Sequence, residues 1–233
     1  YQAVGATVLY IPLDDVSNTD AAAMDKDTVH RLEASLIHWT RQIKEVVNNQ
    51  DNGGATDKSA GPLSEIRFWR ERTLDLNGIS EQLQQPGVAM VVAVLELSKS
   101  SYLPPFHTLA ASIARGSVEA NDNLSFLGVL QGPCEALAIA DPKEDAAVEG
   151  LLRDLLCRIR FIWTNSSFYN TSERVTGLLR KISNELIAAM RRRIDLPAIF
   201  AHSVAEPMEV LRACIGSIEM WRTIYTETVT TIA

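Results

Sequence analysis

The chain has 233 residues, 46% of them hydrophobic, which is enough for a globular core and allows one or two domains. Its formal net charge of −7 and pI near 5.2 argue against a general binder of nucleic acid or anionic membranes, because such binders need an excess of Lys and Arg. The longest strongly apolar run, residues 88–95, is far shorter than the roughly 20 residues of a membrane-spanning helix, so we expect no membrane segment.

The first residues lack an initiator Met and the basic region of a signal peptide, so we expect a segment of a longer chain.

Residues 1–27 favour an arm or a strand over a helix. Residues 8–11 are β-branched and aromatic and are followed by Pro12, which predicts a short strand or an extended arm within residues 1–27. Asp25 and Asp27 then lie where acidic side chains favour the start of a helix.

A helix with a regular apolar seam is predicted from Thr28 onward. Its apolar residues recur at alternating spacings of three and four, the a/d pattern of helices that pack in bundles or coiled coils. Six residues form this seam and are the candidate interface, either within a bundle or against another chain: Val29, Leu32, Leu36, Trp39, Ile43 and Val46.

The next part of the chain alternates between a polar connector and further helices. Residues 48–61 are nearly devoid of apolar side chains and predict a connector. Pro62 suits the first position of a helix that ends at residues 85–87. Residues 88–97 are apolar on all sides and fit a buried strand or a buried helix, and their helical neighbours favour the helix.

Shorter helices are predicted after Pro104 and Pro105, because glycine and proline interrupt the apolar pattern. They span residues 107–115, 118–130 and 135–139, with breaks at Gly116, at Gly132-Pro133 and at Asp141-Pro142.

Three longer helices complete the prediction, over residues 148–163, 173–190 and 206–225. Asn170 and Glu173 resemble a capping box that opens the second of them. Arg191–Arg193 close that helix and could bind an acidic partner, although cations in a last turn more often complement the helix dipole. The predicted fold is all-α, with an arm or strand at residues 1–27 and helical bundles over residues 28–115 and 116–233.

No motif for catalysis or ligand binding is found. The Gly-Lys dipeptide of a phosphate-binding loop is absent, and a sequence that begins like a calcium loop at Asn49 has Ala60 where a bidentate carboxylate is needed. No histidine has a second His or Cys at metal-ligand spacing. We therefore predict no catalytic residue, no metal site and no cofactor in this chain.

Other features have ordinary interpretations. The three widely spaced cysteines, Cys134, Cys157 and Cys214, fit reduced thiols of a cytosolic protein. Two glycosylation sequons are interpreted as coincidental. His30 and His38 lie two turns apart on one predicted helix, where a pH-sensitive contact with a partner is conceivable.

Several segments together resemble the first tail region of dynein heavy chains. The longest are His38-Trp39-Thr40-Arg41-Gln42-Ile43-Lys44-Glu45-Val46 and Gly61-Pro62-Leu63-Ser64-Glu65-Ile66-Arg67-Phe68-Trp69-Arg70-Glu71-Arg72, and shorter ones lie at residues 81–83, 99–104, 119–123, 162–163 and 168–171. The sequences of these segments are more similar to axonemal than to cytoplasmic dynein heavy chains. The chain departs from the pattern at Arg67, where an acidic residue is expected.

The resemblance implies a non-catalytic scaffold: an elongated succession of antiparallel helical bundles in the tail of an axonemal heavy chain. It implies binding to a second heavy chain, to WD-repeat intermediate chains and to light chains, with axonemal docking factors as further partners, and no binding of nucleic acid or membrane. The location would be the cytoplasm and its cytoskeleton, in the axoneme of a cilium or flagellum. ATP and Mg²⁺ would bind only in a motor ring farther along the chain.

A second hypothesis comes from a different class of protein. It is an all-helical enzyme or regulator whose pocket gathers scattered residues such as His107, Arg160 and Glu185, none of which is linked to the others by a motif.

Overall fold

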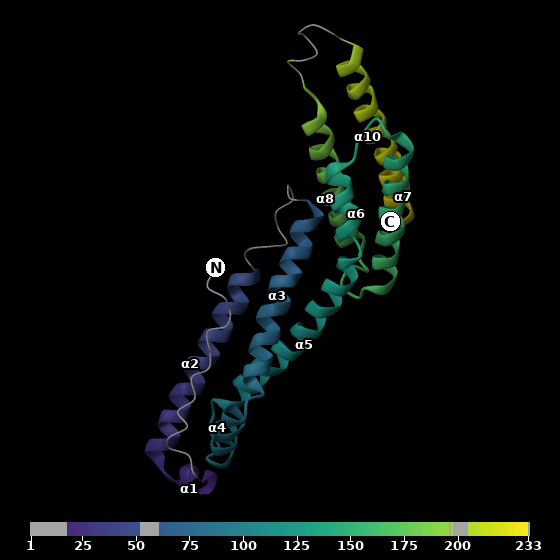
Figure 1. Cartoon of the computed structure of the whole chain (residues 1–233). Helices are drawn as coiled ribbons and strands as arrows, with labels where there is room; N and C mark the ends of the chain where they lie inside the picture. The colour runs from purple at the N-terminus through teal and green to yellow at the C-terminus, as the bar shows by residue number, and fades with distance from the viewer. Residues whose placement is uncertain (1–17, 52–60, 196, 198–204, 233) are drawn as a thin grey trace. The chain divides into compact units, whose positions relative to one another are not determined.

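The computed structural model of this chain describes residues 18–51, 61–195, 197 and 205–232. These residues form nine helices and no strand, so the predicted all-α fold is confirmed for them (Figure 1). The strand or arm expected at residues 8–11 lies outside the described part of the chain. Residues 19–24, at the end of the predicted arm, form the short helix α1 (Thr19–Met24).

The chain divides into two compact units. Unit 1 comprises residues 1–54 and 69–121, and unit 2 comprises residues 55–68 and 122–233. Two long helices, α3 (Pro62–Leu83) and α5 (Leu103–Gly128), contribute residues to both units. Unit 2 includes residues 55–68, which fall within the first predicted bundle. The division into domains at residues 28–115 and 116–233 stays a prediction.

Unit 1 is built around α2 (Lys26–Asp51) and α4 (Pro86–Leu97), which pack against each other and against α1. Residues 88–97, which fitted a strand or a helix, lie in α4, as the helical neighbours had favoured. Its buried residues recur at spacings of three and four, whereas Leu97 is 55% exposed, so α4 is buried along one side although its sequence is apolar all round. The buried apolar residues of α4 and of the first part of α5 are Val88, Val91, Val94, Leu95, Leu103, Phe106 and Ile113.

Asp25 caps the start of α2, as its position in the sequence predicted. Its Oδ2 accepts hydrogen bonds from the Thr28 backbone N–H at 3.2 Å and from the Thr28 hydroxyl at 2.5 Å. The hydroxyl bond is the main cause that lowers the pKa of the Asp25 carboxyl below its usual value. The cap therefore satisfies a backbone donor that the helix itself leaves unpaired.

The turn between α4 and α5 is fixed by a backbone motif that normally uses glycine. The Ser100 N–H donates to the Leu95 carbonyl at 2.9 Å and the Lys99 N–H to the Glu96 carbonyl at 3.0 Å, which is the Schellman pattern. Lys99 is left-handed, with φ of 57°. The Ser100 hydroxyl also donates to Glu33 Oε1 at 2.6 Å and ties the turn to α2.

The predicted break at Gly116 is wrong, because α5 continues through it without interruption. A Cβ atom built at Gly116 would lie 3.4 Å from a methyl carbon of Leu76 on α3. A glycine inside a helix costs only about 1 kcal/mol, which packing on a neighbouring helix can offset. Pro104 and Pro105 likewise lie in the first turn of α5, where proline is tolerated.

Unit 2 is a bundle of α6 (Gln131–Ile139), α7 (Asp145–Asn165), α8 (Ser172–Arg193) and α10 (Ala205–Ile232). Helix α8 packs on α6, α7 and α10, and α7 also packs on α6 and α10. The Trp221 indole N–H of α10 donates to the Ser183 hydroxyl of α8 at 2.7 Å. The buried apolar residues of α7 and α8 are Val148, Leu152, Leu155, Ile159, Ile162, Val175, Leu178, Leu179, Ile182, Leu186, Ala189 and Met190.

The predicted capping box at Asn170 is wrong by one residue. Thr171 is the N-cap of α8, with φ of −137°, and its side chain accepts a hydrogen bond from the Arg174 N–H. Asn170 is exposed and lies one position before the cap. Both residue types can cap a helix, so the backbone conformation at the turn decides which one does.

We predict that replacing Lys99 with glycine stabilises the chain. A side chain at a left-handed position is strained, whereas glycine adopts this conformation freely, so Lys99→Gly should raise the free energy of unfolding by about 0.5–1 kcal/mol in urea titrations. Lys99→Ala is the matched control, because alanine keeps the strained Cβ atom and removes only the charge. A glycine variant no more stable than the alanine variant would contradict the prediction.

Candidate protein-binding surface

Four of the six candidate interface residues form part of the core of unit 1. Leu32 is 1% exposed, and Leu36, Trp39 and Ile43 are fully buried. Val29 and Val46, at the two ends of the seam, are half-buried. The central residues of the a/d seam therefore pack within unit 1. In the described residues they are covered by the chain's own side chains.

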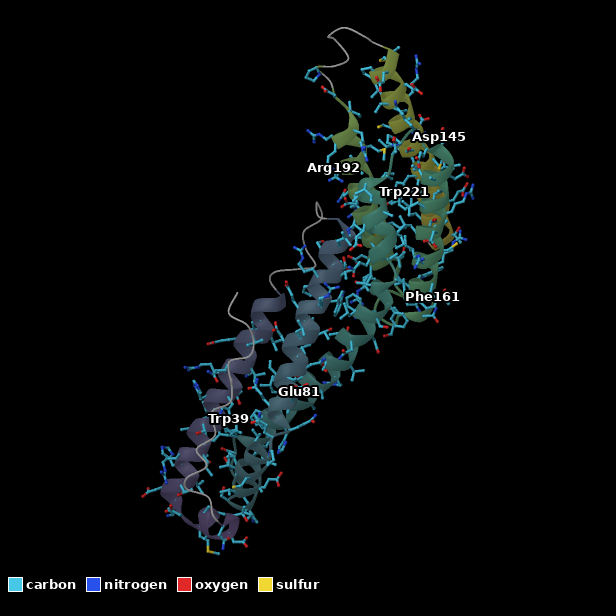
Figure 2. The ribbon with its side chains drawn as sticks, viewed as in Figure 1. Trp39, Glu81, Asp145, Phe161, Arg192 and Trp221 are labelled. Atoms are coloured by element: carbon cyan, nitrogen blue, oxygen red, sulfur yellow. The ribbon has the colours of Figure 1, made fainter. Side chains whose placement is uncertain are left out.

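The cover of this seam comes from within unit 1. The Trp39 ring lies 6.4 Å from the Phe106 ring of α5, centroid to centroid (Figure 2 labels Trp39). Helix α4 packs along α2, and Ser100 bonds Glu33 on the same helix. A partner could reach the buried part of the seam only if unit 1 opened. Whether Val29 or Val46 contacts another chain stays a prediction.

The opposite face of α2 is exposed, and the apolar pattern of the sequence did not mark it as a surface. Between residues 30 and 44 its exposed side chains are His30, Arg31, Ala34, Ile37, His38, Arg41 and Lys44. We refer to these seven residues as the outer stripe. The sequence could have identified the outer stripe, because the positions between the apolar residues of an amphipathic helix form its other face.

Unit 2 contains a buried ion pair between α3 and α8. Lys181 Nζ lies 2.6 Å from Glu65 Oε2, and the two side chains are 6% and 13% exposed. The Tyr169 hydroxyl donates to the other oxygen, Glu65 Oε1, at 2.5 Å. A buried charge needs such partners, because leaving water costs several kcal/mol per ion. Both carboxylate oxygens of Glu65 are thus engaged in holding the bundle together.

A second polar cluster joins the ends of three helices. Arg192 and Arg193 of α8 donate to the carbonyl oxygens of Ala138 and Ile139, the last residues of α6, at 3.2 and 2.7 Å (Figure 2 labels Arg192). Glu185 lies 3.5 Å from Arg192. A Cβ atom at Gly61 would collide with the Glu185 carboxylate, which shows how closely that carboxylate approaches the start of α3.

These contacts place charges where helix dipoles favour them. The Glu185 carboxylate lies at the positive end of α3, and the guanidinium groups of Arg192 and Arg193 bind the free carbonyls at the end of α6. Two of the three arginines that could have bound an acidic partner are therefore used within unit 2. The two arginines complement the dipole of α6, whose last carbonyl oxygens they bind, as well as the dipole of α8, in whose last turn they lie.

The residues suggested for an enzymatic pocket have local partners or are exposed. His107 lies 3.6 Å from Glu96 in unit 1, with both side chains more than half exposed. In unit 2, Glu185 pairs with Arg192, and Arg160 is exposed. Among the described residues no group of three His, Cys, Asp or Glu side chains could hold a metal ion, and no helix is long and apolar enough to cross a membrane.

The three cysteines are free thiols in different environments. Cys134 and Cys214 are buried and Cys157 is exposed. Burial raises the pKa of Cys134 to about 12, and it also raises the pKa of Cys214, whose thiol lies 3.7 Å from the Met190 carbonyl oxygen. Since the thiolate is the reactive form, Cys134 and Cys214 are protected while the unit is folded.

Comparisons with known proteins agree with the resemblance found in the sequence. Residues 29–233 match the family model "Dynein heavy chain, N-terminal region 1". The chain is 46% identical over all 233 residues to the dynein-1-beta heavy chain of the flagellar inner arm I1 complex of Chlamydomonas reinhardtii. It is 48% identical over 183 residues, 78% of its length, to dynein axonemal heavy chain 2 of Homo sapiens. It covers 5% and 4% of the length of these two relatives.

We predict a large loss of stability when the buried ion pair loses one partner. Lys181→Met leaves the Glu65 carboxylate buried without its cation and should lower the free energy of unfolding by about 3 kcal/mol in urea titrations. Adding Glu65→Gln should recover most of this loss, because the amide is neutral and its oxygen still accepts from Tyr169.

The matched control is Lys143→Met, which removes an exposed pair with Glu206 at 3.7 Å. A surface pair of this kind contributes less than about 1 kcal/mol. Equal losses in the Lys143 and Lys181 variants would contradict a structural role for the buried pair.

We also predict that one thiol in three reacts in the folded chain. At pH 8 an excess of an aromatic disulfide reagent should modify Cys157 rapidly and the other two thiols only after unfolding in urea. Cys157→Ser should abolish the fast reaction. A fast reaction that persisted in this variant would mean that Cys134 or Cys214 is accessible.

Proposed function

The chain belongs to the dynein heavy chains, as the N-terminal region 1 of an axonemal member, and from this premise we propose that it is a non-catalytic scaffold in the tail of the motor. The family match over residues 29–233 carries the proposal. The relatives are flagellar and axonemal heavy chains, and the chain accordingly works in the axoneme of a cilium or flagellum.

Tail segments contribute by holding chains together, and the chemistry of this one suits that task. The buried ion pair of Glu65 and Lys181 joins two helices within unit 2. Its helices bury apolar seams and leave polar faces exposed, which is how helical bundles build interfaces without a catalytic pocket. ATP and Mg²⁺ would bind in a motor ring elsewhere in the complete heavy chain.

The proposed partners are the other chains of the motor. They are a second heavy chain, WD-repeat intermediate chains and light chains, with axonemal docking factors as further partners. Exposed faces of the units, rather than the buried seam of α2, would make these contacts, because the seam is covered within unit 1.

We predict that disrupting the core of unit 1 in the complete heavy chain blocks assembly of the motor. Leu36→Asp places a charge at a fully buried position, which should unfold unit 1, since an unpaired buried charge costs several kcal/mol. Purified complexes should then lack the second heavy chain or the intermediate chains, while the Mg²⁺-dependent ATPase of the variant heavy chain remains.

Leu36→Met is the control, because it conserves volume and polarity in the core. Normal assembly of the Leu36→Asp heavy chain would overturn the proposed scaffold role of this region. Loss of the ATPase together with assembly would show that the segment is needed for the motor itself.

A further inference from the structure

The outer stripe of α2 has no exposed acidic side chain, although the chain as a whole has a formal charge of −7. Its seven residues include two cationic side chains near one end, Arg41 and Lys44, and Arg31 near the other. Glu33 lies in the same stretch, but it is half-buried and accepts the hydrogen bond that ties α2 to the turn before α5. Asp27, one turn before Arg31, and Glu45, the residue after the stripe, are exposed and mark where its positive character ends.

Helix geometry gathers most of these residues on one side. His30, Ala34, Ile37, Arg41 and Lys44 follow one another at spacings of four and three, so they form a line along the helix opposite the buried seam. At a rise of 1.5 Å per residue the line is about 21 Å long, the length of a four-turn helix.

The centre of the stripe is apolar. Ile37 is 43% exposed, and Ala34, one turn before it, is small and exposed. Small residues let another backbone approach closely, and an exposed branched side chain beside one provides an apolar contact. Arg31 donates to the Thr28 hydroxyl at 3.2 Å and is one of the groups that lower the pKa of the Asp25 carboxyl, so a partner's carboxylate would share this guanidinium with the start of α2. The stripe therefore combines an apolar centre with cations on both sides.

We infer that the outer stripe of α2 is a docking surface for an acidic amphipathic helix of a partner protein. Carboxylates on that helix would pair with Arg31, Arg41 and Lys44, and its apolar side chains would contact Ile37. The inference rests on the proposed scaffold function and specifies one surface through which it would act.

The spacing of charges favours a protein helix over a phosphate-bearing ligand. Arg31 and Arg41 are ten residues apart, about 15 Å along the helix, with Ala34 and Ile37 between them. Phosphate sites instead bring several cations or backbone N–H groups to one point. Carboxylates spaced along a second helix match the observed separation.

The test places a photo-crosslinking amino acid, p-benzoylphenylalanine, at Ile37 in the complete heavy chain. After irradiation of assembled complexes, mass spectrometry identifies the cross-linked segment. We expect a helical segment with an excess of Asp and Glu. The double charge reversal Arg41→Glu with Lys44→Glu should lower the yield about fivefold or more, because like charges then face each other. Reversing the acidic residues of the captured segment to Lys should restore it.

Matched controls separate this surface from general effects of charge and exposure. The probe at Val118, which is 62% exposed on α5 in the same unit, should give a yield that the double reversal leaves unchanged. Lys99→Glu reverses an exposed cation outside the stripe and should not affect the yield at Ile37.

Four results would overturn the inference. They are an absent cross-link at Ile37, a captured segment that is neutral or basic, a yield insensitive to the double reversal, and capture of nucleic acid or lipid in place of protein. The proposed function is judged separately by assembly of the Leu36→Asp heavy chain. If that variant fails to assemble while the charge reversal leaves the cross-linking yield unchanged, the scaffold role is supported and the inferred docking surface is rejected.

Discussion

The long helices in the described part of the chain bury an apolar face, and the positions of their polar groups follow from that constraint. Helix α2 shows the consequence most clearly. Leu32, Leu36, Trp39 and Ile43 recur every three or four residues and are buried, so the residues on the opposite side of the helix face outward. Burying these residues removes apolar surface from water at about 25 cal/mol per Å², the main favourable contribution to folding.

Where the apolar faces meet polar groups, unit 2 pairs several of those groups internally. The Glu65 carboxylate binds the Lys181 ammonium and the Tyr169 hydroxyl, and the arginines at the end of α8 bind the terminal carbonyls of α6. A buried pair of this kind adds little net stability compared with apolar packing, but loss of one partner is costly. The pair therefore favours one arrangement of α3 and α8 over alternatives that leave either charge unpaired. We have no comparable account of the buried Asn123 amide nitrogen, which has no hydrogen-bond partner among the described residues.

Because of the same constraint, one face of α2 is needed for folding and the opposite face is open to solvent. The central seam residues hold unit 1 together, and the outer stripe forms a side of α2 that a partner can reach without opening the unit. Substitutions in the seam test whether the region is needed at all, and substitutions in the outer stripe test what it binds. For a member of the dynein heavy chains that covers about 5% of a relative's length, this distinction determines how mutations should be interpreted.

The sequence by itself determined the helical fold, most helix positions, the cap at Asp25 and the family, because apolar periodicity, capping residues and sequence motifs are local properties. Only the tertiary structure decided that α5 continues through Gly116, because a glycine inside a helix costs only about 1 kcal/mol and the packing of the whole helix can offset it. It also decided that Tyr169 and Glu65, 104 residues apart, share a hydrogen bond. Periodicity predicts that one face of a helix is buried, but it does not specify what covers that face. That depends on contacts between distant segments, which is why the seam of α2 proved to be core and its opposite face the candidate surface.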